Sequence, residues 1–237
     1  MNDIAVPQEQ LAVDIAVLKQ QLADALLMME RAEIIDFNGH MSARVPGKPH
    51  MLINSAPSVR SAITVDDIVT TDLDGNLIEG DAPPPAEFHI HAAIYRHRPD
   101  VNSVAHTHPK WSTILSMVGQ PVKPVMMQAA VLGEVQTFAK ISSIKNRSLG
   151  EELAEALGEH RVAVLKSHGA VVAARSVVDA FVFAVYLEET AQRQYLATQI
   201  GQPTVLTPEE VRLIGEQLSK PNILQKVWDH HHAKLVR

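Results

Sequence analysis

The sequence predicts an α/β fold in which helices cover a sheet that occupies the middle of the chain. A long amphipathic pattern opens the chain, short apolar runs fill its middle, and helix-capping residues mark its end. The 237 residues, of which 46% are hydrophobic and 20% are charged, are enough for one large core and few for two. We therefore expect a single domain over residues 1–237, with a helical tail from about residue 203.

The first third of the chain is expected to hold one helix followed by strands. Its opening helix carries apolar side chains at steps of three and four residues, which is the period of an amphipathic helix. A turn at Asn38-Gly39 precedes the first strand, and Asp74-Gly75 suits the type I′ turn of a hairpin. The expected elements are a helix over 8–33, strands over 40–45, 51–54, 68–73 and 76–79, and a helix-opening cap over 64–67.

Helices and strands alternate through the rest of the chain. The proline run at 83–85 cannot continue a strand but can lead into a helix. Ser176 and Thr207 each stand where a side chain can cap the first turn of a helix. The expected elements are helices over 86–97, 111–118, 149–158 and 176–200 and another from 207, and strands over 101–108, 161–165 and 170–174.

The composition excludes several classes of function. The chain has no cysteine, so disulfides and thiolate ligands are ruled out and any metal must be bound by nitrogen and oxygen. A net charge of −6 without a basic run indicates no nucleic-acid partner, and no apolar stretch approaches the roughly 20 residues that span a membrane. A start that does not look like a signal peptide, together with the lack of cysteine, favours a cytoplasmic protein that acts on small molecules.

Three histidines and one glutamate form a pattern with a clear chemical meaning. His106 and His108 occupy alternate positions of one predicted strand, so their imidazoles should point to the same side. His168 stands between two apolar β runs, and Gly169 after it lets the backbone bend so that the ring leaves the sheet. Together with the Glu87 carboxylate, three imidazoles would hold a divalent metal and leave positions open for water or substrate.

Each of these four residues also has an interpretation without a metal. His106 and His108 would be polar residues on the outward face of an edge strand, and His168 would cap a turn between core strands. Glu87 would be an acidic residue favoured at the start of a helix by the helix dipole. Pro109 places the histidine pair at a strand end, where ligand sites tend to form, and this position favours the metal interpretation.

Two further groups of residues are candidates for binding. His230-His231-His232 looks like a metal-binding tract but stands in a helical tail, so we expect solvated residues or subunit contacts there. Substrate carboxylates are bound by cationic side chains, and guanidinium groups can bind them with two hydrogen bonds. The candidates of this kind are Arg44, Arg60, Lys145 and Arg147.

Three longer motifs surround the candidate ligands. They are Glu87-Phe-His-Ile-His-Ala-Ala-Ile-Tyr-Arg-His-Arg-Pro-Asp100, Val104-Ala-His-Thr-His-Pro109 and Ser167-His-Gly-Ala170. In this order, over about residues 15–195, the chain resembles the class II aldolase/adducin-head family. The resemblance implies a three-layer α/β/α sandwich around a mixed, largely antiparallel sheet, and a homotetramer with its site near a subunit interface. It also implies a divalent metal, Mn²⁺ or Zn²⁺, on His106, His108 and His168, and an acid/base glutamate at Glu87.

The chain departs from the sugar-phosphate aldolases of that family in the loops that hold the substrate phosphate. A Gly-Asn-x-Ser loop is replaced by Gly39-His-Met-Ser42, and a Ser/Thr-Gly turn is replaced by Ser55-Ala-Pro-Ser58. Pro57 removes a backbone N–H, so a phosphate site is not expected. The residues expected to bind a small-molecule carboxylate are His40, Ser42, Arg44, Ser55 and Arg60.

The stretches 39–44, 71–76 and 82–87 resemble the decarboxylase branch of the family, whose members act on hydroxylated aromatic or pyridine dicarboxylates and on carboxymuconate semialdehydes. The resemblance therefore implies non-oxidative decarboxylation of a hydroxy-substituted aromatic or ring-cleavage-derived carboxylate. One alternative is a metal-dependent class II (retro-)aldolase acting on a non-phosphorylated hydroxy acid. Another is a non-enzymatic scaffold, as in adducin heads, which are expected to lack metal ligands, whereas all four positions are filled here.

Overall fold

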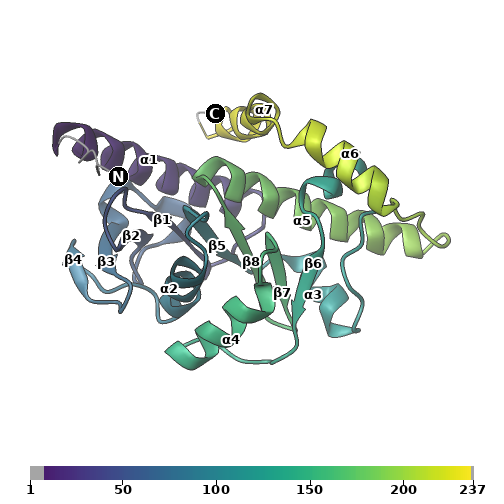
Figure 1. Cartoon of the computed structure of the whole chain (residues 1–237), viewed down its shortest axis with the longest axis horizontal. Helices are drawn as coiled ribbons and strands as arrows, with labels where there is room; N and C mark the ends of the chain where they lie inside the picture. The colour runs from purple at the N-terminus through teal and green to yellow at the C-terminus, as the bar shows by residue number, and fades with distance from the viewer. Residues whose placement is uncertain (1–7, 236–237) are drawn as a thin grey trace, which may run out of the picture.

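One eight-stranded sheet forms the centre of the molecule, as the computed structural model in Figure 1 shows. The structure describes residues 8–235, with side chains from residue 14 on, so residues 1–7 and 236–237 of the predicted domain lie outside it. The strands are β1 His40–Arg44, β2 His50–Asn54, β3 Ile68–Asp72, β4 Leu77–Glu79, β5 Ser103–Thr107, β6 Val135–Phe138, β7 Val162–Leu165 and β8 Gly169–Ala174. Their order is β4-β3-β2-β1-β5-β8-β7-β6, and every neighbouring pair is antiparallel except β6 and β7.

Helices cover both faces of the sheet. They are α1 Gln8–Arg31, α2 Phe88–His97, α3 Lys110–Met117, α4 Arg147–Leu157, α5 Val177–Thr198, α6 Pro208–Leu218 and α7 Pro221–His232, with short 3₁₀ helices η1 Arg60–Ala62, η2 Val65–Asp67 and η3 Met127–Val131. Helices α1, α3 and α5 pack on one face, and α2 and α4 pack on the other. The predicted α/β/α sandwich with a mixed, largely antiparallel sheet is confirmed.

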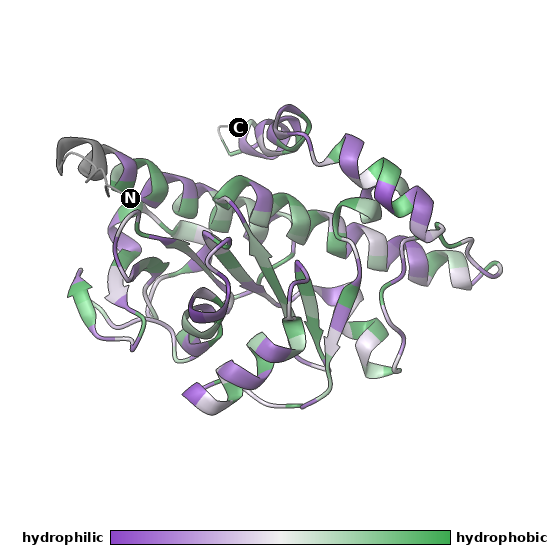
Figure 2. Cartoon of the chain, viewed as in Figure 1, coloured by the Kyte–Doolittle hydropathy of each residue, from purple (hydrophilic) through white to green (hydrophobic). Residues whose placement is uncertain are grey.

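The strands have a hydrophobic core on each side, which explains why their apolar runs are nearly continuous. On β1, Met41 and Ala43 belong to the core beneath α1 and α5. On β5, Val104 belongs to the opposite core, beneath α2 and α4. Figure 2 shows hydrophobic residues concentrated in the central strands and in α5. Alternation along β1 and β5 therefore directs His40, Ser42 and His106 toward the α2 side.

The connection between β3 and β4 differs from the predicted type I′ turn. That turn requires a positive φ at two successive residues, but here Gly75 has a φ of 86° and Asp74 does not have a positive φ. Instead, the Asp72 carboxylate accepts hydrogen bonds from the backbone N–H groups of Asp74 and Asn76, each at 2.9 Å. The side chain of Asp72 thus organises a longer loop, and the hairpin itself is present as predicted.

Two expectations about the length and number of elements also need correction. The cap over 64–67 opens only the 3₁₀ helix η2, although its predicted capping box is present. Strand β6 was not expected, because it has four residues at the edge of the sheet and only Phe138 among them is buried. The predicted tail contains α6 and α7, and Trp228 of α7 packs edge-to-face on Phe181 of α5. No helix among the described residues is long and apolar enough to cross a membrane.

Candidate metal centre

The four predicted ligands meet at one end of β5. His106 lies in that strand, His108 follows its last residue, His168 lies in the turn between β7 and β8, and Glu87 immediately precedes α2. Each residue offers one ligand atom, and these atoms all lie within 4.8 Å of one another. Because β5 pairs with β8, the turn that carries His168 is held beside the end of β5.

A close approach of two backbones sets the position of His168. A Cβ atom at Gly169 would lie 2.2 Å from the carbonyl oxygen of Thr107 and 3.0 Å from Cδ2 of His108, so only glycine fits there. The tight turn itself is made by Ser167, which adopts a φ of 56°. Gly169 is therefore needed for space, and the expectation that it provides the bend is corrected.

Each histidine of the cluster is oriented by an oxygen atom on its far side. Nδ1 of His106 lies 3.1 Å from the carbonyl of Ala170, and Nδ1 of His168 lies 3.1 Å from the carbonyl of Ser142. A carbonyl oxygen can only accept, so both rings donate from Nδ1, and the neutral form of each ring then has its lone pair on Nε2. Nδ1 of His108 lies 3.3 Å from the Asp36 carboxylate, which imposes the same tautomer.

The lone pairs of the three rings face a common point. Nε2 of His106 lies 3.1 Å from Nε2 of His108, and Oε2 of Glu87 lies 3.6 Å from Nε2 of His106 and 3.7 Å from that of His168. Lone pairs held this close repel one another unless a cation or a proton lies between them. Three imidazole nitrogens and a carboxylate oxygen, each oriented by a partner behind it, fit a divalent cation such as Zn²⁺ or Mn²⁺.

Electrostatics keep these side chains in their ligating forms. Burial and, to a smaller extent, the electrostatic interaction with His106 lower the pKa of His108 to about 4 and also lower the pKa of His168. Burial alone would raise the pKa of Glu87, but its interactions with His106 and the N–H of Ile144 hold that pKa at about 2. At neutral pH, His108 and His168 are therefore neutral and the carboxylate is ionised, as metal binding requires.

A cavity of about 480 Å³ opens beside the cluster. Glu87, His108 and His168 line it on the ligand side, and the cationic side chains Arg60 and Lys145 line it elsewhere. Of the five residues expected to bind substrate, His40 and Arg60 reach this cavity. The site therefore combines potential metal ligands with positive charge, and this combination suits a small anionic molecule.

The structure does not bring Ser42, Arg44 or Ser55 to the cavity. Ser42 is fully buried, and Ser55 is 3% exposed. The Arg44 guanidinium donates to the backbone carbonyls of Tyr95, Arg98 and Val101 at 2.9–3.1 Å and stacks on the Tyr95 ring. Both faces of β1 are covered, so Ser42 and Arg44 on its α2 side point into packed protein, and only His40 at the start of the strand reaches the cavity.

Several residues near the site were not assigned a role from the sequence. Asp36 orients His108, and His91 and Tyr95 of α2 contact the β1 residues His40 and Ser42. A signal for the last two did exist in the sequence. His91 and Tyr95 are one helical turn apart, so they lie on the same face of α2. His40 and Ser42 alternate along β1, so they lie on the same face of the sheet, the face that α2 covers.

Four other candidate residues lie outside the cavity. Arg147 is exposed and faces Glu151 at 3.6 Å. In the C-terminal tract, His231 packs edge-to-face on the Phe181 ring, and Nε2 of His232 lies 3.3 Å from the Asp24 carboxylate. His230, His231 and His232 do not belong to the four-residue cluster.

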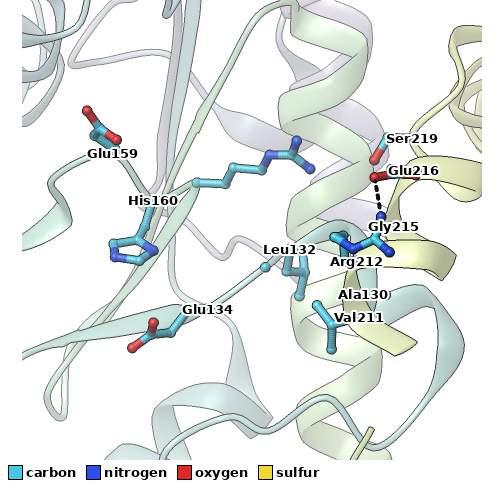
Figure 3. Close-up of a pocket in the computed structure, with 12 residues that line it drawn as sticks. Ala130, Leu132, Glu134, Glu159, His160, Val211, Arg212, Gly215, Glu216 and Ser219 are labelled. Carbon is cyan, nitrogen blue, oxygen red and sulfur yellow. Dashed lines mark hydrogen bonds and ion pairs between the residues drawn. The ribbon is translucent and has the colours of Figure 1, made fainter. Parts of the chain in front are cut away.

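A second cavity, of about 470 Å³, lies beside α6 and is shown in Figure 3. Its charged side chains do not converge as the ligands of the first cavity do. Glu134, Glu159 and His160 point away from α6 in Figure 3, and Arg212 pairs with Glu216 at 3.1 Å. The cavity beside β5 therefore remains the candidate active site.

Comparison with known proteins supports the same conclusion. The chain is 28% identical over 152 residues to a 5-deoxy-D-ribulose 1-phosphate aldolase of Bacillus thuringiensis serovar kurstaki, which covers 64% of this chain and 71% of that protein. It is 28% identical over 211 residues to a 3,4-dihydroxyphthalate decarboxylase of Arthrobacter keyseri, which covers 83% of this chain and 85% of that protein. A solved L-fuculose 1-phosphate aldolase superposes with a TM-score of 0.79 at 26% identity, over 86% of this chain and 97% of the other.

A family model described as Class II Aldolase and Adducin N-terminal domain matches residues 20–195. This range includes the whole sheet and all four residues of the cluster. The protein therefore belongs to the class II aldolase/adducin family.

Proposed function

We propose that this protein is a divalent-metal-dependent, non-oxidative decarboxylase of a hydroxy-substituted aromatic or ring-cleavage-derived carboxylate. The relative from Arthrobacter keyseri, a 3,4-dihydroxyphthalate decarboxylase, supports this proposal because the similarity extends over 83% of the chain. The relatives that act on sugar phosphates support an aldolase instead. The choice between the two depends on whether the cavity is built to bind a phosphate.

The observation that carries the proposal is that the backbone N–H groups between residues 55 and 58 are already hydrogen-bonded within the protein. The N–H groups of Ser55, Ala56 and Ser58 donate to backbone carbonyls at 2.8, 2.9 and 3.3 Å, and Pro57 has no N–H. A backbone phosphate site needs several N–H groups that point together at the anion. This segment has none to offer, which favours a substrate without a phosphate.

Arg60 has the geometry of a carboxylate-binding residue. Its Nε donates to the carbonyl of Gly39 at 2.7 Å, and its Nη1 donates to the Ser58 hydroxyl at 2.5 Å. Nη2 has no hydrogen-bond partner among the residues that the structure describes, and the residue lines the cavity. A guanidinium fixed on one side and open on the other can bind a carboxylate without losing further side-chain entropy. Lys145 adds a second positive charge to the same cavity.

The residues of this chain suit a reaction in which a carbon–carbon bond to a carboxylate breaks. A divalent cation on His106, His108, His168 and Glu87 would act as a Lewis acid toward a substrate oxygen. As carbon dioxide leaves, its bonding electron pair stays on the substrate carbon, which then takes a proton from water. The resulting hydroxide combines with carbon dioxide to give bicarbonate. Glu87 is ionised, so it accepts a hydrogen bond from that water and orients it toward the carbon.

An aldolase is the second candidate function, favoured by the names of several relatives. It would use the same four residues, but the bond would break toward an aldehyde. Glu87 would then accept the proton of a substrate hydroxyl group as the carbonyl forms. A non-phosphorylated hydroxy acid is the substrate that the backbone between residues 55 and 58 allows.

We also propose a homotetramer with the site near a subunit interface. Large hydrophobic side chains close in sequence to cavity residues are exposed: Phe37 is 81% exposed, Ile141 68% and Val59 64%. Each lies one or two residues from a residue that lines the cavity. Exposed apolar side chains grouped in this way are typical of protein–protein contacts. A cytoplasmic location is proposed from the cysteine-free composition.

Product analysis tests the proposed reaction. Protein loaded with Zn²⁺ or Mn²⁺ is incubated with ortho-hydroxy aromatic carboxylates, including 3,4-dihydroxyphthalate, and separately with hydroxy-acid aldols. We expect carbon dioxide without aldehyde, lost in His106→Ala and retained in the control His89→Gln, which changes a histidine of α2 outside the cavity. Aldehyde release without carbon dioxide would replace the decarboxylase with the aldolase.

A further inference from the structure

Four side chains form a line of hydrogen bonds that runs from the cavity into the packing between β1 and α2. Nδ1 of His40 lies 2.6 Å from Nε2 of His91. Nδ1 of His91 lies 2.6 Å from Oγ of Ser42, which in turn lies 2.7 Å from the Tyr95 hydroxyl. His91 and Ser42 are fully buried, whereas His40 lines the cavity. The line therefore connects a cavity residue to three residues that no substrate can reach.

The direction of these hydrogen bonds follows from the hydroxyl at the inner end. Burial raises the pKa of Tyr95, so its hydroxyl keeps its proton. Within the described chain, the acceptor at hydrogen-bond distance from that hydroxyl is Oγ of Ser42. The backbone of Val104 also interacts with Tyr95 and with His91, favouring the charged phenolate of Tyr95 and the charged ring of His91. Tyr95 therefore donates to Ser42, since an unused buried hydroxyl proton is costly.

The remaining protons of the line are then fixed in turn. Ser42 accepts from Tyr95, so its own hydroxyl proton points to Nδ1 of His91. Burial lowers the pKa of His91 to about 3, so the ring is neutral and its one proton is on Nε2, which donates to Nδ1 of His40. The reverse order, with His91 donating to Ser42, would leave one of the two hydroxyl protons without an acceptor. Nδ1 of His40 is then the acceptor, so the proton of the His40 ring is on Nε2.

We propose that Tyr95, Ser42 and His91 are positioning residues that hold His40 as its Nε2–H tautomer, so that His40 presents a hydrogen-bond donor to an oxygen of the substrate. Nε2 of His40 has no hydrogen-bond partner among the described residues, and its ring lies 4.9 Å from that of His106. A donor at this position stabilises an oxygen that gains negative charge, whereas a lone pair there would repel it. The substrate role rests on the proposed function, but the tautomer does not.

Nuclear magnetic resonance of the histidine rings tests the tautomer without any substrate. The zinc-loaded protein is labelled with ¹⁵N-histidine, and the His40 signals are assigned by their loss in His40→Gln. We expect the proton on Nε2 in the wild type, and a mixture of tautomers in Ser42→Ala, because His91 then loses the donor that fixes it. A proton on Nδ1 of His40 in the wild type would overturn the proposal, as would an unchanged single tautomer in Ser42→Ala. This result does not depend on which reaction the protein catalyses.

Kinetics test whether the line acts through His40 or only supports the fold. His91→Phe is expected to lower kcat by about 10-fold to 100-fold while one zinc ion per chain is retained. His91→Gln should recover most of that loss, because an amide N–H can replace the Nε2–H that donates to His40. Loss of zinc in both variants, or no recovery with glutamine, would indicate a purely structural role and overturn the proposal. His89→Gln, on the same helix but outside the line, is the control.

Discussion

Two groups of three histidines differ in how their rings are arranged. One group contains the candidate metal ligands His106, His108 and His168, and the other stands at the end of α7. His230, His231 and His232 are adjacent in the sequence, but successive residues of a helix point about 100° apart. His231 contacts Phe181, and His232 contacts Asp24. The three candidate ligand histidines come from two segments, the end of β5 and the turn between β7 and β8, yet their ligand atoms lie within 4.8 Å of one another and of Glu87. A metal site depends on how ring nitrogens converge in space and not on how many histidines share a stretch of sequence.

The two groups also differ in what stands behind each ring. In the three candidate ligand histidines, every Nδ1 faces an oxygen acceptor, so every Nε2 is directed at the same point. In the tail, a carboxylate contacts the ring of His232, and it contacts Nε2, the nitrogen that would otherwise be a ligand. The candidate ligand rings are therefore oriented so that they could bind a cation together. In the tail, His231 packs on Phe181 and His232 contacts Asp24 instead.

The largest expected effect separates the two groups directly. His168→Ala removes one of three imidazole ligands, and we expect the affinity for Zn²⁺ to fall at least about 100-fold. The matched variant His231→Ala should keep one zinc ion per chain. Metal content after dialysis, measured by mass spectrometry, checks both. Equal loss in the two variants would contradict the assignment of the site to the cavity.

Glu87→Gln tests the carboxylate of the cluster. Among the described residues, Glu87 is the one carboxylate grouped with the ligand nitrogens of His106, His108 and His168. We expect turnover to fall by about 10²- to 10⁴-fold, because the amide cannot orient water as an ionised carboxylate does. Glu189→Gln, a carboxylate near His231, should leave turnover unchanged. Product release from the identified substrate measures this effect. A Glu87→Gln protein with full turnover would remove Glu87 from the proposed reaction.

A smaller effect is expected from the oxygen behind His108. Asp36→Asn weakens the acceptor of the Nδ1–H, and the affinity for Zn²⁺ should fall about 10-fold. Asp24→Asn changes the acidic partner of His232 and should not alter zinc binding. Competition with a chromophoric chelator measures both affinities. If both variants bind zinc as the wild type does, the role of Asp36 in orienting His108 is wrong.

The smallest effect concerns stability and belongs to the tail. Burial, together with Lys234 and His230, lowers the pKa of His231 below 6.5, and Glu189 opposes the shift. Between the lowered pKa and about 6.5, the unfolded chain binds more protons at this residue than the folded chain. The free energy of unfolding should therefore decrease as the pH falls through that range, and His231→Gln should reduce this slope.

Denaturant unfolding at about pH 5 and about pH 7.5 measures the slope. The zinc content of His231→Gln at the higher pH is the control and should equal that of the wild type. An unchanged slope would show that the environment of His231 does not disfavour its charged form.

Local patterns were enough to predict most elements and the four residues that cluster at the end of β5. Ser176 and Thr207 accept hydrogen bonds from the N–H groups of Asp179 and Glu210, as their capping positions predicted. The cluster was predictable because His106 and His108 alternate along one strand and its end, and each of the four residues stands in a distinctive short motif. A helix cap and the pair His106 and His108 each involve residues that are close in the sequence. The period of the helix or strand then determines where their side chains point.

The remaining features depend on contacts between distant segments. Ser42 and Arg44 were expected in the cavity, but both faces of β1 are covered, so polarity alone could not indicate which end of the strand meets open space. Asp36 and His108 are 72 residues apart and share no motif. Strand β6 depends on its pairing with β7 and has little hydrophobic pattern of its own. Such features become visible only when the whole sheet is assembled.

Gly169 has a consequence for how this active site can change over evolution. Because the absence of a side chain there lets β8 approach the end of β5, two backbones and not the cavity walls set the separation of His108 and His168. The side chains that face the substrate can then be exchanged without moving the ligands. We therefore expect substitutions in the cavity wall to change which molecules fit while the spacing of His108 and His168 stays the same.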